Sequence, residues 1–332
     1  MSRLDDVLVI GIASSALFNL SEGHRVFTEQ GVDAYRAYQL QNRDTILNPG
    51  TAFEFVRKLL ALNDLAADRK LVEVVLLSRN SPDTGRRIMT SIKHFGLDMS
   101  RAVFTQGRSP YIYHEAFEID LFLSENDNDV REAIKLGCPA GRVYPAREPV
   151  LPAQKEHSVT IAFDFDGVLA DDSSERVYAE GDLQSFLIHE VDNMDIPAID
   201  GPIKPFFMAV SAIQELETLK KESDPTYQRR LRSSIVTARN SPADVRVLNT
   251  LESWGVTVDD AFFLGGLEKG PVLSVLKPDI FFDDQKVHVE NAAKHTMSAH
   301  VVFGVRNEKS STPVHSEPPA SVSSESLRVA RS

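Results

Sequence analysis

The chain has 332 residues, one cysteine and a formal net charge of -12 at pH 7. That length suggests about two domains, and 42% hydrophobic with 25% charged residues is typical of a globular protein. The acidic charge disfavours nucleic acid and anionic membranes as main partners, while a small anionic ligand remains compatible with a locally positive pocket or a metal. A single thiol, Cys138, forms no internal disulfide, and the apolar stretch Val7 to Phe18 follows Asp5 and Asp6 rather than basic residues. We therefore expect a cytoplasmic enzyme or binding protein without a membrane span.

Short apolar runs alternate with stretches of helical periodicity along most of the chain, which predicts a parallel α/β sheet. Helices are predicted over Arg86–Phe95 and Val245–Trp254. From Asn307 to Ser332 the sequence is rich in Ser, Pro and Glu, so we expect a disordered tail there. The predicted buried strands are Val7–Ile10, Val74–Leu77, Ile161–Phe163, Ile235–Val236 and Ile280–Phe282.

An internal repeat divides the chain into two copies. Arg79-Asn80-Ser81-Pro82 recurs as Arg239-Asn240-Ser241-Pro242, each time directly after a predicted strand. Further matches keep the same order, and we expect the copies to join near Arg147 to His157. The other matching pairs are Ile10–Ser15 with Ile161–Asp166, Ala102–Phe104 with Ala261–Phe263, and Asp120–Leu123 with Asp279–Phe282.

The second copy carries charged residues that the first copy lacks. The replacements are Asp164 by Ala13, Asp166 by Ser15, Lys269 by Pro110 and Asp283 by Ser124. We infer that the second copy is catalytic and the first is a structural or substrate-covering relative.

Two carboxylates follow a predicted buried strand of the second copy. Asp164 and Asp166 come directly after Ile161–Phe163, and their i, i+2 spacing points both to one side of the strand end. Ligands bind at the carboxyl ends of parallel strands, and Gly167 allows a tight turn at this point. Two carboxylates this close repel unless a cation shares them, which favours a hard cation such as Mg²⁺. The alternative is a surface pair of aspartates that caps the loop.

A strand end and a helix start supply groups that can hold a phosphate. Thr237 and Ala238 follow Ile235–Val236, where a hydroxyl and backbone N–H groups can bind phosphate oxygens. A threonine at such a place is otherwise a turn or helix-cap residue. Lys269 precedes Gly270-Pro271 at a predicted helix start, where a cation does not stabilise the helix dipole. That position favours a functional lysine over a solvated one.

Asp283 and Asp284 follow the predicted strand Ile280–Phe282. Because adjacent strand residues point in opposite directions, we expect Asp283 to meet the metal directly and Asp284 to lie behind it or act through water. Adjacent acids at a strand end mean little alone, but here they complete an ordered series: Asp-x-Asp, Thr, Lys, Asp-Asp.

This series resembles the haloacid dehalogenase superfamily, whose phosphatases carry the four elements on a Rossmann-like sheet. The resemblance implies two haloacid dehalogenase-type units in tandem: a degenerate one over residues 1–150 and a catalytic one over residues 151–306, followed by the tail from residue 307. The second unit would contain a cap insertion at about residues 170–233. It further implies that Asp164 is the nucleophile and Asp166 the general acid and base. The phosphoryl group would be held by Thr237, Ala238 and Lys269, and Mg²⁺ by Asp164, Asp166, Asp283 and Asp284.

The chain is also similar to the cytosolic 5'-nucleotidase I family over about residues 7–306. This implies hydrolysis of nucleoside 5'-monophosphates, AMP-like or IMP-like, with Mg²⁺ in the cytoplasm. Phe165 and Gly167 stand where animal members have Gly and Ala, which leaves both aspartates in place. The segments that carry the similarity include Ala13–Phe18, Phe27–Val32, Tyr38–Leu40, Asn48–Phe53, Ser91–Leu97, Ser174–Arg176, Gly201–Lys204, Val236–Arg239, Lys269–Pro271 and Phe281–Gln285.

Two other functions remain open from the sequence. One is a phosphatase for another small monoester, such as a sugar phosphate; the other is a non-catalytic nucleotide-sensing protein. We found no glycine-rich phosphate loop, so kinase and dehydrogenase functions have no support. A homo-oligomer also remains open. Four residues of the insertion could contact base or ribose, or could equally be packing or surface residues: Arg176, Phe186, His189 and Lys204.

Overall fold

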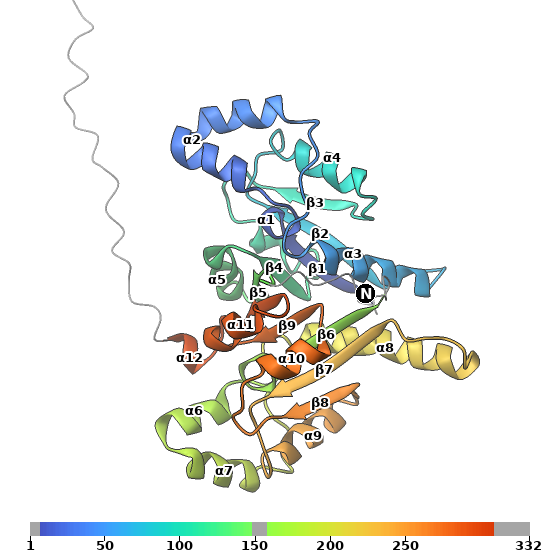
Figure 1. Cartoon of the computed structure of the whole chain (residues 1–332), viewed down its shortest axis with the longest axis vertical. Helices are drawn as coiled ribbons and strands as arrows, with labels where there is room; N and C mark the ends of the chain where they lie inside the picture. The colour runs from blue at the N-terminus through green and yellow to red at the C-terminus, as the bar shows by residue number, and fades with distance from the viewer. Residues whose placement is uncertain (1–6, 148–157, 309–332) are drawn as a thin grey trace, which may run out of the picture.

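The computed structural model describes residues 7–147 and 158–308. The expected junction of the two copies lies outside the described residues except at its first residue, Arg147, and the expected tail lies outside them after residue 308. Figure 1 shows the first half of the chain above the second.

The first half alternates strands and helices as its sequence pattern predicts. Its five strands are β1 (Leu8–Ala13), β2 (Val72–Ser78), β3 (Arg101–Phe104), β4 (Leu121–Ser124) and β5 (Ala140–Tyr144). Its helices are α1 (Ser14–Leu17), α2 (Ser21–Gln41), α3 (Phe53–Ala61), α4 (Arg86–His94) and α5 (Asp127–Lys135), with short 3-10 turns η1 (Leu62–Leu65) and η2 (Tyr111–Tyr113). The central strands β1 and β2 are buried along their whole length, which is why most of their residues are apolar.

The second half repeats this alternation. Its strands are β6 (Val159–Phe163), β7 (Leu231–Thr237), β8 (Asp260–Phe263), β9 (Ile280–Asp283) and β10 (Ser298–His300). Its helices are the turn η3 (Phe165–Leu169), α6 (Ser173–Glu180), α7 (Leu183–Asp192), α8 (Lys204–Ser223), α9 (Asp244–Ser253), α10 (Gly270–Leu276), α11 (Lys286–Ala292) and α12 (Val305–Glu308).

All ten strands form one sheet, in the order β3-β2-β1-β4-β5-β10-β9-β6-β7-β8. The order within each half is the same, read outward from the centre of the sheet. The sheet is mostly parallel, as expected: β5 and β10 pair antiparallel, whereas the other paired strands are parallel. This pair joins the halves, so their strands run in opposite directions across one continuous sheet.

The segment between the first two strands has a related form in both halves. In the first half it contains α1, α2 and α3, and in the second it contains η3, α6, α7 and α8. Figure 1 shows α2 and the pair α6 and α7 projecting from the same side of the molecule, at its two ends. The insertion expected for the second half therefore has a counterpart in the first.

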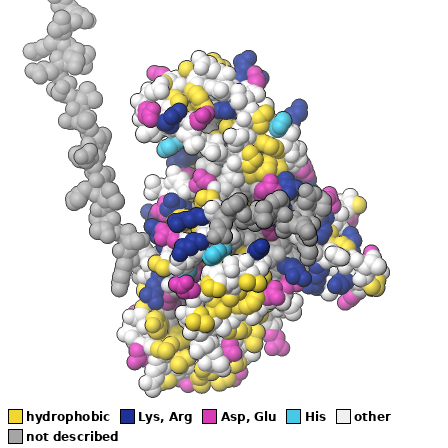
Figure 2. All heavy atoms as spheres, viewed as in Figure 1, with side chains coloured by type: hydrophobic (Ala, Val, Ile, Leu, Met, Phe, Trp, Pro, Cys, Tyr) yellow, Lys and Arg dark blue, Asp and Glu magenta, His cyan; other side chains and the backbone are white. Residues whose placement is uncertain are grey.

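The hydrophobic core is shared between the halves. One cluster of buried residues runs from Leu8 on β1 to Phe282 on β9 and includes side chains of α3 and α8. Smaller clusters lie within each half, around Phe122 in the first and Phe281 in the second. Figure 2 shows hydrophobic side chains gathering on the lower part of the visible face, over the second half of the chain. Within the described residues, no helix has both the length and the apolar character needed to cross a bilayer.

The first two residues of the expected tail are part of a helix. Asn307 and Glu308 belong to α12. The Asn307 side-chain amide donates to the backbone carbonyl of Asp284 at 2.9 Å and to that of Phe303 at 2.6 Å. These hydrogen bonds hold the end of the described chain against the carboxyl end of β9.

Candidate active site

Asp164 lies directly after β6, at the entry to the turn η3. The backbone N–H of Phe165 donates to its Oδ1 at 2.7 Å, and Lys269 Nζ lies 2.5 Å from its Oδ2. Burial raises the pKa of Asp164 to about 7, and the nearby Asp283 and Asp166 carboxylates also raise it, while the ammonium of Lys269 opposes them.

Lys269 occupies the N-cap of α10, where Pro271 in the first turn favours the helix start. Its side chain is 3% exposed and bridges two strand ends, at 2.5 Å from Asp164 and 2.7 Å from Asp283. Burial lowers the pKa of this lysine, but the two carboxylates outweigh burial and raise it above its usual value. Lys269 is therefore a buried, permanently charged ammonium beside the predicted nucleophile.

Asp283 and Asp284 at the end of β9 differ sharply in their surroundings. Asp283 pairs with Lys269, accepts the backbone N–H of Gln285 at 2.8 Å and lies 3.4 Å from His288 Nδ1. Burial would raise its pKa, but Lys269 and His288 lower it overall. Both oxygens of Asp284 are buried without a hydrogen-bond partner among the residues that the structure describes. Burial raises the pKa of Asp284 well above its usual value, and three neighbouring carboxylates raise it further.

Glu175 on α6 joins this acidic cluster. Its Oε1 accepts Gln285 Nε2 at 3.0 Å and Arg306 Nε at 2.7 Å, whereas its Oε2 is buried and lacks a hydrogen-bond partner within the described chain. Burial raises its pKa, and the charges of Asp166 and Asp283 add to that effect while Arg306 opposes it. A cluster of carboxylates with unsatisfied buried oxygens is a favourable environment for a hard cation.

The turn after β6 is shaped around Asp284. Gly167 has a φ of +69°, and a Cβ at this position would lie 2.6 Å from Asp284 Cγ. Only glycine therefore lets the turn pass this close to the carboxylate. Separately, one oxygen of Asp164, one of Asp283 and a ring nitrogen of His288 lie within 4.8 Å of one another, as ligands of one metal ion could.

Asp166 is held by an arginine that the sequence analysis did not single out as functional. Arg239 donates from Nε and Nη2 to the two oxygens of Asp166, at 2.7 and 2.6 Å. Its Nη1 pairs with Glu190 on α7, which also pairs with Arg246 Nη1 at 3.0 Å. Glu190 is fully buried and the side chains of both arginines are at most 5% exposed. A buried ion-pair network therefore ties α7 to the strand ends.

Thr237 is the last residue of β7 and is 1% exposed. β7 pairs with β6, with Phe163 opposite Ile235, so Thr237 and Ala238 lie at the same edge of the sheet as Asp164. The Thr237 hydroxyl accepts the backbone N–H of Arg239 at 3.3 Å, which fits the turn-residue alternative as well as a ligand role.

The structure thus brings Asp164, Lys269 and Asp283 into direct contact and places Thr237, Asp284 and Asp166 around them. Sequence reasoning missed Glu190, Arg246 and His288, and quoted Arg239 and Glu175 only within matched segments. Among the four insertion residues, Phe186 contacts the ion-pair network: its ring packs 5.5 Å from the Arg239 guanidinium. Arg176 and Lys204 pair with Asp172 and Asp200, and His189 Nε2 lies 3.4 Å from Arg246.

Comparison with known proteins shows one family over nearly all of the described chain. The model of the family described as 5'-nucleotidase matches residues 1–308. The chain is 34% identical over 298 residues to cytosolic 5'-nucleotidase 1B of Homo sapiens, an alignment that covers 87% of this chain and 48% of that protein. This chain therefore spans about half the length of the curated relative it matches.

Proposed function

This chain belongs to the 5'-nucleotidase family, and from that membership and the site geometry we propose that it hydrolyses nucleoside 5'-monophosphates, AMP-like or IMP-like, to nucleoside and phosphate. The observation that carries the proposal is the buried contact of Lys269 with Asp164 and Asp283, which supplies one cation beside a carboxylate nucleophile. The resemblance to the cytosolic 5'-nucleotidase I family stated from the sequence is confirmed by the comparisons. The relative's name places that protein in the cytosol, and we propose the same location here.

In the proposed reaction Asp164 attacks the phosphorus of the substrate. A bond forms from its carboxylate oxygen to phosphorus as the bond from phosphorus to the 5' oxygen breaks, which leaves an aspartyl-phosphate. Asp166 gives a proton to the departing 5' oxygen and then takes one from the water that hydrolyses the aspartyl-phosphate. Lys269, with Thr237 and the backbone N–H of Ala238, holds the phosphoryl oxygens and offsets their charge.

Arg239 restrains Asp166 in the structure, because it occupies both oxygens of that carboxylate. Proton transfer at the 5' oxygen requires one of these oxygens to be released to the substrate. The same guanidinium also packs against Phe165 and Phe186, so its position is coupled to the turn after β6 and to α7.

We further propose that Asp164, Asp166, Asp283 and Asp284 form a Mg²⁺ site. The unpartnered buried oxygens of Asp284 support this assignment, as does the excess of carboxylates over cations around them. Asp283 is already engaged by Lys269 and Gln285, so we favour Asp284 as the direct ligand, the reverse of the sequence expectation. When bound, Mg²⁺ would neutralise phosphoryl charge as a Lewis acid.

We propose that the halves are tandem haloacid dehalogenase-type units, with residues 1–150 degenerate and residues 151–306 catalytic, and that residues 170–233 form the cap. The common strand order of the two halves supports this. So do matched hydrogen bonds: Val9 N–H donates to Asp120 and Thr160 N–H donates to Asp279, both at 2.8 Å.

Turnover of a nucleotide panel and a sugar-phosphate panel tests the proposed function. We expect Mg²⁺-dependent phosphate release from nucleoside monophosphates, and Asp164→Asn should lower kcat by at least about 10³-fold. Asp98→Asn removes an exposed acid that pairs with Lys70 in the first half and should leave turnover unchanged. Preferential release from sugar phosphates, or full activity of Asp164→Asn, would refute the proposal.

The metal assignment has its own test. Asp284→Asn keeps the size of the side chain and removes its charge, so the Mg²⁺ concentration for half-maximal activity should rise by at least about tenfold. Isothermal titration of Mg²⁺ into the protein without substrate should show the same weakening. Equal Mg²⁺ affinity of the variant and the wild type would contradict the assignment.

A further inference from the structure

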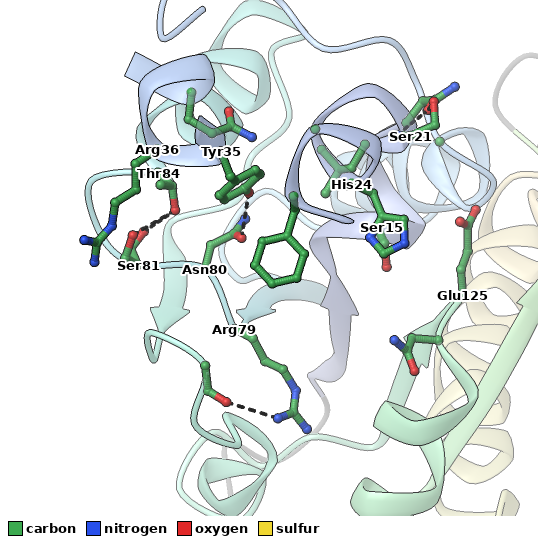
Figure 3. Close-up of a pocket in the computed structure, with 18 of the residues that line it drawn as sticks. Ser15, Ser21, His24, Tyr35, Arg36, Arg79, Asn80, Ser81, Thr84 and Glu125 are labelled. Carbon is green, nitrogen blue, oxygen red and sulfur yellow. Dashed lines mark hydrogen bonds between the residues drawn. The ribbon is translucent and has the colours of Figure 1, made fainter. Parts of the chain in front are cut away.

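The first half contains a large pocket at the carboxyl ends of β1, β2 and β4. Its volume is about 1140 Å³, and α2 forms one of its walls. Figure 3 shows Tyr35, Asn80, His24, Ser15 and Glu125 arranged around it.

This pocket occupies the place that the candidate active site occupies in the second half. The two sites follow equivalent strands, β1 and β6, and equivalent side chains make the same local contacts. Phe27 and Tyr35 form an edge-on ring pair at 5.8 Å, as Tyr178 and Phe186 do at 6.3 Å. Arg87 Nε donates to the carbonyl of Thr45 at 2.9 Å, as Arg246 Nε does to that of Ile196 at 3.0 Å.

The pocket is open because the ion pairs that fill the second site cannot form in the first. Gln39 and Ser15 stand where the second half has Glu190 and Asp166, the two partners of Arg239. The counterpart of Arg239 is Arg79, which turns away to pair with Asp129 at 3.0 Å and with Glu132. Figure 3 shows Arg79 at the edge of the group, bonded to a backbone oxygen.

The groups that would hold a phosphate in the second half are missing here. Pro110 replaces Lys269 and Ala13 replaces Asp164, while Leu77 follows the strand pattern at the place of Thr237. The charge of Arg79 is already balanced by its two carboxylates. Glu125, at the place of Asp284, adds a negative charge to the pocket and accepts the Thr51 hydroxyl at 2.5 Å. Arg36 also lines the pocket, but it is an exposed side chain of α2 near Asp83 and does not replace the buried cradle of the second half. A phosphorylated ligand would therefore lose its main means of charge neutralisation.

The pocket also has side chains in its walls that suit an uncharged aromatic ligand. Phe27 lines the pocket and is 47% exposed, so its ring is free to stack with a planar base. Tyr35 Oη donates a hydrogen bond to Asn80 Oδ1 at 3.1 Å, and this bond fixes the orientation of the Asn80 amide group. The carboxylate of Glu125 offers an acceptor for sugar hydroxyls, and the side-chain nitrogen of Asn126, whose Oδ1 caps α5, offers a donor.

We propose that this pocket binds an uncharged nucleoside, the class of molecule that the second half releases. The choice of a nucleoside as ligand rests on the proposed function. The existence of the pocket and its lack of phosphate-binding groups are independent of that function. The site is separate from the catalytic one, because it is lined by residues of the first half alone.

Equilibrium dialysis of labelled adenosine against the full-length Asp164→Asn protein tests the proposal without turnover. We expect adenosine to bind in the presence of saturating inorganic phosphate. Val32→Trp should weaken that binding by narrowing the pocket, and Phe27→Ala should weaken it about tenfold. Val32 is 53% exposed, so neither substitution disturbs the core, and circular dichroism verifies the fold.

Tyr178→Ala is the matched control, because Tyr178 is the counterpart of Phe27 in the second half and should not affect this binding. Unchanged adenosine binding in both Val32→Trp and Phe27→Ala would overturn the proposal. Tighter binding of ADP than of adenosine, if Val32→Trp weakens it, would also overturn the proposal, since the pocket would then accept a phosphorylated ligand. A failure of the proposed function would appear separately, as absence of nucleotide hydrolysis by the wild-type protein.

Discussion

Substitution of Glu190 by Gln tests the buried ion-pair network that closes the second half. The change keeps the shape of the side chain and removes its charge. In the wild-type structure this carboxylate accepts the Ser174 hydroxyl at 2.6 Å and pairs with Arg239 and Arg246. One side chain of α7 thereby links α6, the loop after β7 and α9.

The size of the loss in stability depends on which partners each arginine keeps in the Glu190→Gln variant. Arg239 retains Asp166, but Arg246 keeps only neutral partners, which include the carbonyl of Ile196 and the hydroxyl of Ser174. An unpaired buried charge costs about 3–5 kcal/mol. Because one of the two guanidiniums remains paired, we expect the free energy of unfolding to fall by about 3 kcal/mol, the lower end of that range.

Urea unfolding followed by the fluorescence of Trp254, the single tryptophan, measures this loss. The matched control is Glu54→Gln, which breaks an ion pair with Arg57 at 2.8 Å whose side chains are 63% and 38% exposed. The control should change stability by less than about 0.5 kcal/mol. If Glu190→Gln loses no more than the control, the network does not behave as a buried charge cluster, and our reading of α7 as fixed by charge is wrong.

Two further substitutions test a close approach and a buried thiol. Gly167→Ala should lower the free energy of unfolding by more than Gly137→Ala does, because Gly137 shares a positive φ but has open space where a Cβ would lie. The backbone strain common to both variants is about 1 kcal/mol. Equal losses in the two variants would rule out the contact with Asp284. Burial raises the pKa of Cys138 to about 12, so its contribution to stability is fully present below about pH 8.5 and is lost as the pH rises toward 12. In that pH window the free energy of unfolding of the wild type should fall by about 1.4 kcal/mol per pH unit relative to that of Cys138→Ala. Parallel curves of unfolding free energy against pH for the two proteins would contradict this. The native thiol should also resist Ellman's reagent at pH 8.

The strands and the main site residues could be predicted because their signals are local. β1, β2, β6, β7 and β9 each contain a short apolar run, since both faces of the sheet are covered. Asp164, Lys269 and Asp283 each stand at or just after the end of a strand, or directly before a helix. The topology of a parallel sheet then brings such positions together. Sequence order was sufficient to predict this convergence.

The junction of the halves could not be predicted in this way. β5 contains Gly141 and Arg142, and β10 has three residues without a β-branched side chain. Their antiparallel pairing joins segments more than 150 residues apart, for which no local pattern exists. Glu190 was missed for a related reason: a charged residue on an amphipathic helix usually faces solvent, and only the tertiary structure shows that two arginines bury it.

The antiparallel pairing of β5 with β10 also affects how Asp284 is held. Ser124, Arg142, His300 and Asp283 stand in one row of the sheet, through consecutive register pairs across β4, β5, β10 and β9. Arg142 Nε donates to the carbonyl of Glu125 at 3.1 Å, and His300 Nε2 lies 2.9 Å from that of Asp284.

In each half, a side chain of the last strand thus holds the residue that follows the strand beside it: β5 holds the residue after β4, and β10 holds the residue after β9. Because β10 is completed only by β5, the support of Asp284 depends on the first half. Without that half, β10 would become an exposed edge and the shared core around β1 and α3 would be opened. The first half is thus part of the structure that builds the candidate active site, which is a closer role than that of a cover over it.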